Sequence, residues 1–239
     1  MGKEKRQATL KETQAAQCLM HPETFESAYL LGFLWADGYT SKTTGYKVGC
    51  EIVTRDFVDI EKIISNVGIE WKLRHRERLN RQPQTSFRVS NKPLKEHLDK
   101  LGFSRKSSHS CEEILESIPK DLQYAWWHGF LDGDGNLYFN KRWSTCQITF
   151  AGSYDLSWEY RRKKLIDVVC LERPRINRQV VEKTGHRCSC LRVTNIKDCQ
   201  KLIRYIYQDE NQGIKRKYNK AMEILRLNIA PRKSRIVEI

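Results

Sequence analysis

The chain of 239 residues has no long hydrophobic run and no secretory leader. No segment approaches the roughly 18 apolar residues of a membrane-spanning helix, so we expect no membrane partner. The opening, MGKEKRQATLKET, lacks the apolar core of a signal peptide. These absences disfavour membrane and secreted classes of protein.

Cysteine is present, but without the spacing of a zinc site or a disulfide framework. The eight cysteines include no C-x-x-C pair, and the closest two, Cys188 and Cys190, have a single residue between them. Zinc ligands usually have about two to four intervening residues and a second ligand pair, which His186 alone does not supply. We therefore expect reduced thiols in an intracellular protein of the cytoplasm, nucleoid or an organelle matrix.

Acidic residues are scarce relative to basic ones. Lys and Arg number 43 against 29 Asp and Glu, which gives a formal net charge of +14. Such an excess favours a polyanionic partner, with nucleic acid first and an anionic membrane surface second. The remaining alternative is an ordinary basic enzyme. A hydrophobic content of 39% predicts a folded chain.

The chain contains an internal duplication. Residues 28–38 (AYLLGFLWADG) and 125–135 (AWWHGFLDGDG) share Ala, Gly-Phe-Leu and Asp-Gly at one offset of 97 residues. This spacing is too long for a solenoid unit and indicates a duplicated subdomain. Both segments are densely apolar and end at a glycine, which predicts two helices. Pro119 lies close to the start of the second helix.

Each predicted helix carries small residues at positions i, i+4 and i+8. A stripe of this kind lies on one helix face and permits a close approach between two backbones. A helical glycine costs about 1 kcal/mol relative to alanine, so such packing must offset it. We expect the two stripes to face each other, although each helix could instead pack on some other element. The stripes are Ala28, Gly32, Ala36 and Ala125, Gly129, Gly133.

An aspartate follows each stripe. Asp37 and Asp134 would lie at helix C-termini, where a carboxylate is mildly unfavourable. If the helices pack together, the two carboxylates converge, and a divalent metal bridging them to phosphate oxygens would relieve the repulsion. Two other interpretations remain: a plain Asp-Gly turn, and a calcium loop beginning at Asp132, which lacks the required Gly and Glu.

The periodicities predict an α+β fold with two halves of the order helix, two strands, helix, two strands, helix. The four strands of each half need a helical layer behind one apolar face, which leaves a polar face open. Apart from the two helices of the duplicated segments, the predicted helices are 56–67, 92–101, 155–169 and 196–207. The predicted strands are 46–54, 69–78, 84–89, 137–141, 145–150, 173–181 and 188–193.

The open faces are rich in Arg, Lys and Gln, which suits the major groove of duplex DNA, although an ordinary solvated sheet face is the alternative. The aromatics Trp71 and Phe87 fall on the inward side, which disfavours stacking on RNA bases. Strand alternation selects as DNA contacts Lys47, Glu51, Arg74, Arg76, Arg78, Arg88, Gln147, Arg175 and Arg192. A register error of one residue would invert any strand.

The two signature segments resemble those of two-repeat LAGLIDADG homing endonucleases, and the similarity covers about residues 22–228. Segments 119–135 and 213–221 (GIKRKYNKA) resemble the second signature and the C-terminal helix of that family. The resemblance implies two pseudo-symmetric αββαββα half-domains, with signature helices at the centre and antiparallel sheets forming a DNA-binding saddle. The expected division is a basic arm at 1–21, repeats at 22–116 and 117–230, and a tail at 231–239.

The resemblance also implies a set of site residues. Asp37 and Asp134 would bind Mg²⁺, for which Mn²⁺ should substitute, with help from the carbonyls of Ala36 and Gly133. Lys92, Lys197 and Arg55 are the implied catalytic residues around the metal, with Lys197 shifted by one position relative to its counterpart. The earlier acid of the signature is Asp132 in the second copy and Trp35 in the first, a position that is not normally a metal ligand.

The implied activity is a metal-dependent, staggered double-strand break with 3′ overhangs in a long duplex DNA target, made by a monomer. Two rivals share the fold: a maturase that binds group I intron RNA, and a regulator that binds DNA without cutting it. An intein fragment is disfavoured, because residue 1 is neither Cys nor Ser and no terminal His-Asn occurs.

Overall fold

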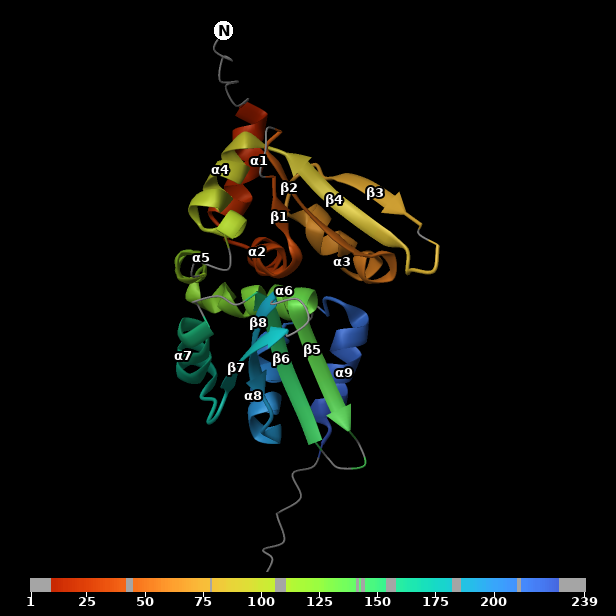
Figure 1. The fold of residues 1–239 in the computed structure, drawn as a ribbon. Helices are drawn as coiled ribbons and strands as arrows, with labels where there is room; N and C mark the ends of the chain where they lie inside the picture. The colour runs from red at the N-terminus through yellow and green to blue at the C-terminus, as the bar shows by residue number, and fades with distance from the viewer. Residues whose placement is uncertain are drawn as a thin grey trace, which may run out of the picture.

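The computed structural model of the protein describes residues 10–41, 45–77, 79–105, 111–140, 142, 145–153, 158–181, 186–209 and 212–227. The predicted α+β fold with two αββαββα halves is confirmed (Figure 1). The first half comprises α2 (Phe25–Asp37), β1 (Tyr39–Thr40), β2 (Lys47–Val53), α3 (Thr54–Asn66), β3 (Lys72–Arg76), β4 (Gln84–Ser90) and α4 (Lys92–Lys100). The second half comprises α6 (Gln123–Asp134), β5 (Gly135–Asn140), β6 (Thr145–Ser153), α7 (Trp158–Val169), β7 (Arg175–Val181), β8 (His186–Val193) and α8 (Ile196–Ile206).

The signature helices α2 and α6 pack against each other at the centre, between the two halves (Figure 1). A Cβ atom on Gly32 would lie 2.0 Å from the carbonyl oxygen of Trp126, and one on Gly129 would lie 1.9 Å from that of Tyr29. Backbone therefore meets backbone at these two glycines, and no side chain larger than hydrogen fits. The alternative in which each helix packs elsewhere is wrong.

Each half contains a four-stranded antiparallel sheet, in the orders β1-β2-β4-β3 and β5-β6-β8-β7. Helices α3 and α4 contact the first sheet, and α7 and α8 contact the second. The covered faces carry buried apolar side chains, which include Val48, Cys50, Phe87, Ile148, Phe150 and Leu191. The opposite faces carry polar residues. This arrangement follows from the alternation along the strands, since neighbouring side chains point to opposite faces.

Several elements depart from the sequence expectations. The expected N-terminal arm contains a helix, α1 (Leu10–Met20), which buries Ala16 and Leu19 and packs on α4. Strand β1 has two residues, and β3 is shorter than expected. Leu73 of β3 is 44% exposed, because this edge strand extends beyond the helical layer. The further elements are η1 (Phe103–Arg105), α5 (Glu112–Ser117), η2 (Lys120–Leu122) and α9 (Lys215–Leu225).

Some expectations fall outside the described residues: the segment 1–9, Arg78 and the tail at 231–239. Residues 155–157 of the helix predicted at 155–169 lie outside as well, and the described helix, α7, begins at Trp158. None of the described helices is long and apolar enough to cross a membrane.

Candidate active site at the ends of the central helices

The close packing of α2 and α6 brings their C-terminal ends together. Asp37 and Asp134 are the last residues of the two helices. A Cβ built on Gly133 would lie 2.4 Å from the Cβ of Ala36 and 3.6 Å from Oδ2 of Asp37. Asp37 thus lies against the residue that immediately precedes Asp134. Asp37 is exposed and Asp134 is half-buried, so both carboxylates lie at the protein surface.

The donor set at these helix ends fits a small divalent cation that a substrate helps to coordinate. Within the described ranges, no group of three or more His, Cys, Asp or Glu side chains is placed to hold a metal. The protein offers two carboxylates and nearby backbone carbonyls. Mg²⁺ typically keeps several waters and binds one or two carboxylates together with substrate phosphates, so this sparse set suits it. A structural zinc site or an all-protein calcium cage needs more ligands.

The calcium-loop interpretation is excluded by the position of Asp132. This side chain is 2% exposed, and its Oδ2 accepts hydrogen bonds from the hydroxyl of Tyr29 (2.7 Å) and the backbone N–H of Ile214 (2.8 Å). Burial, followed by the adjacent Asp132 carboxylate, raises the pKa of Tyr29 well above its usual value, so the phenol remains a donor. Asp132 is therefore a buried structural acceptor.

The cluster around Asp132 also includes His128 and Gly213. The Nε2 atom of the fully buried His128 lies 3.5 Å from Oδ2 of Asp132. Burial is the largest influence on the pKa of His128 and lowers it, although Asp132 acts in the opposite direction. Gly213 has a φ of +58°, and a Cβ there would lie 2.1 Å from Oδ2 of Asp132. Only glycine lets the chain pass this close to the carboxylate.

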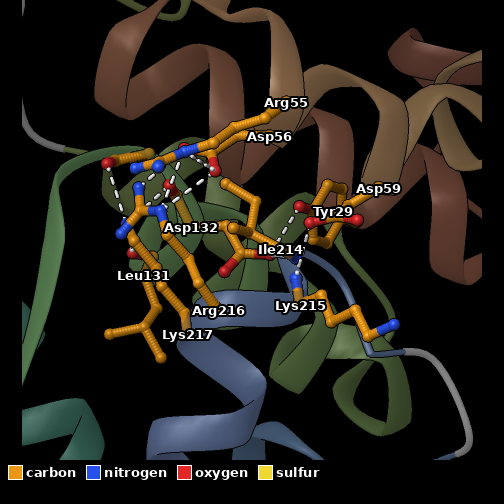
Figure 2. Close-up of polar contacts among 11 residues, drawn as sticks. Tyr29, Arg55, Asp56, Asp59, Leu131, Asp132, Ile214, Lys215, Arg216 and Lys217 are labelled. Carbon is orange, nitrogen blue, oxygen red and sulfur yellow. Dashed lines mark hydrogen bonds and ion pairs between the residues drawn. The ribbon is translucent and has the colours of Figure 1, made fainter.

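A lysine that the sequence interpretation missed lies directly behind the end of α6. Lys217 of α9 is 5% exposed, and its Nζ donates to the carbonyl oxygens of Leu131 (2.7 Å), Asp132 (2.7 Å) and Gly133 (3.2 Å), as Figure 2 shows in part. Burial lowers the pKa of Lys217 to about 8, against the opposing influence of Asp132. A cation at a helix C-terminus offsets its partial negative charge, and here also that of the aspartate ending the helix.

The contact to Gly133 bears on the expected metal ligands. The Gly133 carbonyl was predicted to help bind the metal, and it already accepts a hydrogen bond from Lys217. A carbonyl oxygen has two lone pairs, so one remains for a second partner. Lys217 therefore fixes the orientation of this carbonyl without consuming it.

The residues before Lys217 connect the second half to the first. Arg216 forms a bidentate pair with Asp56 of α3, with Nε 3.0 Å from Oδ1 and Nη2 2.7 Å from Oδ2. This hydrogen-bonded pairing raises the pKa of Arg216. The backbone N–H of Lys215 donates to Asp59 (3.0 Å). The predicted residue Arg55 is exposed, with its Nε 3.6 Å from Oδ1 of Asp56, and it joins this cluster (Figure 2).

Lys92 and Lys197 lie in the first turns of α4 and α8, and their catalytic role stays a prediction. Lys92 begins α4 after Ser90, which pairs with Lys47, whereas Tyr39, two residues after Asp37, pairs with Gly49. Ser90, the last residue of β4, therefore pairs with the first residue of β2. The Nζ of Lys92 lies 4.0 Å from Glu96 and 5.8 Å from the ring of Tyr46.

Lys197 is placed in the equivalent way in the second half. It lies in the first turn of α8, which follows β8. The last residue of β8, Val193, pairs with Ile148, and Gly135 pairs with Phe150. Each of the two lysines thus belongs to the helix that follows the last strand of its half.

The expected DNA contacts share the uncovered faces of the two sheets. In the first sheet, Arg74 pairs with Ser86, which pairs with Glu51, and Arg88 pairs with Lys72. Arg76 lies 3.7 Å from Glu51 on the same face. Residues paired in a ladder point to the same face. The predicted residues on the uncovered faces are Lys47, Glu51, Arg74, Arg76 and Arg88 in the first sheet and Gln147, Arg175 and Arg192 in the second.

The fold is that of the LAGLIDADG homing endonucleases. No protein-family model matches the sequence, and no curated protein matches it either. Three solved structures are similar over most of their length. I-WcaI bound to its DNA recognition sequence has a TM-score of 0.57 at 12% identity, covering 89% of this chain and 92% of that one.

Two further solved structures have similar folds. I-DmoI in complex with DNA and Ca has a TM-score of 0.53 at 16% identity, covering 83% of this chain and 97% of that one. The meganuclease I-CpaMI bound to uncleaved DNA has a TM-score of 0.52 at 14% identity, covering 83% and 90%. At these identities the likeness establishes the architecture, and the activity has to be argued from the site.

Proposed function

We propose that the chain is a metal-dependent, site-specific DNA endonuclease that cuts both strands of a long duplex target. The observation that supports the proposal is the position of Asp37 against Gly133, the residue before Asp134, at the ends of the central helices. Because one chain supplies both halves and both acids, a monomer suffices. The finer proposal is that of a homing endonuclease that leaves staggered ends with 3′ overhangs.

Each site residue has a role that follows from its contacts. Asp37 and Asp134, with the carbonyls of Ala36 and Gly133, would hold Mg²⁺ or Mn²⁺ against a DNA phosphate. Such an ion lowers the pKa of a bound water and stabilises the leaving oxygen. Lys217 holds the end of α6 and offsets the charge of the carboxylates, because its ammonium is bonded to three carbonyls there. Arg55, exposed beside the same cluster, would contact DNA or its hydration shell.

The partner proposed is duplex DNA, held by the uncovered sheet faces. The charge of +14 and the cations on these faces support this choice. The printed names of similar structures support it too: I-WcaI is bound to its DNA recognition sequence, and I-DmoI is in complex with DNA and Ca.

The test is cleavage of a plasmid library that carries a randomised insert. Purified protein with Mg²⁺ should linearise a small subset of plasmids, and sequencing of the ends gives the target and the overhang. Asp37→Asn and Asp134→Asn should each reduce double-strand cleavage at least about a hundredfold while leaving DNA binding and the unfolding transition unchanged. Undiminished cleavage by either variant, or equal cleavage in EDTA, would contradict the proposal.

A second candidate is a maturase that binds group I intron RNA. One observation favours it: Tyr39 and Tyr138 are 42% and 47% exposed, and they lie on the uncovered faces in register with Gly49 and Gln147. Exposed aromatics can stack on unpaired bases. Tight binding of intron RNA, weakened by Tyr138→Ala, together with an intact plasmid library would favour this candidate over the nuclease.

A further inference from the structure

The two uncovered sheet faces can be superposed row by row, where a row is a set of residues paired across one sheet. Tyr39 lies two residues after Asp37, and its row continues through Gly49 and Arg88 to Lys72. Asn136 lies two residues after Asp134, and its row runs through Thr149 and Arg192 to Arg175. These first rows are therefore equivalent positions in the two halves.

The first rows have the same chemistry on their last two strands, β4 and β3 in the first sheet and β8 and β7 in the second. Each ends in two adjacent cations, Arg88 and Lys72 in the first sheet and Arg192 and Arg175 in the second. Two neighbouring cations repel each other and require an anion between them, so phosphate contact is the natural role. This role carries no sequence information and is the same for both halves.

The second rows differ between the halves. In the first sheet the row is Glu51, Ser86 and Arg74, and in the second sheet it is Ala151, Cys190 and Asn177. An exposed guanidinium in one half therefore has a carboxamide as its counterpart in the other. Within the described residues Arg74 forms no ion pair, whereas Arg76 in the next row lies 3.7 Å from Glu51.

These two side chains recognise different bases. In the major groove a guanidinium donates two hydrogen bonds to O6 and N7 of guanine, whereas a carboxamide donates to N7 and accepts from the N6 amino group of adenine. Both side chains are on outer strands of the uncovered faces, next to the cation pairs that would fix the backbone. We infer that Arg74 contacts a guanine of the DNA target, and that Asn177 contacts an adenine at the symmetry-related position. The inference rests on the proposed DNA target.

The test is a binding selection, in which the full chain selects duplexes from a library whose central segment is fully randomised. Ca²⁺ replaces Mg²⁺ in the buffer. The selected sequences should contain one guanine and one adenine at positions related by the pseudo-twofold axis. The preference for guanine over the other bases should be about 5- to 150-fold, the range for one bidentate base contact. Arg74→Asn should change the guanine position alone, and Asn177→Arg should change the adenine position alone to guanine.

Matched controls separate base recognition from general electrostatics. Lys72→Gln and Arg175→Gln, in the first rows, should weaken binding to all sequences and reduce the salt dependence without changing the selected bases. Circular dichroism confirms that each variant is folded. The same base at both positions, or a guanine preference that survives Arg74→Asn, would overturn the inference. Binding without sequence enrichment would overturn it and leave a DNA-binding protein, whereas no duplex binding would overturn the proposed function as well.

Discussion

Substitution of Gly129 by alanine tests whether the close contact of α2 and α6 sets both stability and catalysis. A Cβ at this position would lie 1.9 Å from the carbonyl oxygen of Tyr29 and 2.8 Å from the backbone nitrogen of Phe33. Real Cβ atoms essentially never come within 3.0 Å of such neighbours. The atoms that clash belong to backbone, so no side chain can rotate away, and the helices must separate by about 1 Å.

The expected magnitude combines two opposing effects. Overpacking a core costs about 1–3 kcal/mol, and the upper end applies because backbone opposes backbone. Alanine favours a helix over glycine by about 1 kcal/mol, which offsets part of that cost. The free energy of unfolding should therefore fall by about 2 kcal/mol in urea titrations. A displacement of about 1 Å between Asp37 and Asp134 should also lower the cleavage rate by about a hundredfold.

The matched control is Gly152→Ala in β6. A Cβ there would meet only one atom, Cζ2 of Trp158, at the ordinary contact distance of 3.6 Å. This variant should change neither the free energy of unfolding by more than about 0.5 kcal/mol nor the cleavage rate. If Gly129→Ala behaves like Gly152→Ala in both assays, the central helices are not in the contact described, and the argument for neighbouring carboxylates fails.

Two further predictions concern buried polar groups. The pKa of Lys217 is about 8 in the folded chain, below the ordinary value of 10.5, so the unfolded chain binds this proton more tightly. The free energy of unfolding, relative to that of Lys217→Met, should therefore rise between pH 8 and pH 10 by up to about 1.4 kcal/mol per pH unit. Urea titrations of both proteins at several pH values measure this difference. A difference that stays constant with pH would contradict the prediction. Tyr29→Phe removes a 2.7 Å hydrogen bond to the buried Asp132 carboxylate and should lower the free energy of unfolding by about 1.5–3 kcal/mol. A change in the free energy of unfolding of less than about 0.5 kcal/mol, as for a neutral surface substitution, would show that this hydrogen bond does not stabilise the core.

The sequence predicted the parts of the fold that depend on local patterns and on the duplication. The glycine stripes predicted the central helix pair, because facing stripes account for the matched spacing of Gly32 and Gly129. Strand alternation placed Arg74 and Arg88 on the uncovered face. The short β1 was not separated from β2, since two residues are too few for a period to be read. Helix α1 was taken as part of an arm, because its polar composition hides two buried residues, Ala16 and Leu19.

The candidate site was predictable only where its residues belong to the repeated motif. Asp37 and Asp134 follow from the duplication. Lys217 does not, because it lies more than 80 residues along the chain from the carbonyls it contacts. The basic run at 215–217 was visible in the sequence, but nothing local distinguishes a buried lysine from a solvated one. Lys92 and Lys197 were chosen by resemblance alone, and their catalytic role stays a prediction.

The contacts of residues 213–217 affect when the site can form during synthesis. Asp56 and Asp132 emerge from the ribosome well before the segment that supplies Arg216 and the N–H of Ile214. Until then the buried carboxylate of Asp132 lacks one of its two donors, and the end of α6 lacks its cation. A nascent chain would thus complete the proposed catalytic centre only after nearly all of the described residues had been translated. For the proposed nuclease, partial chains that carry one or both aspartates would be poorly equipped to damage the genome that encodes them.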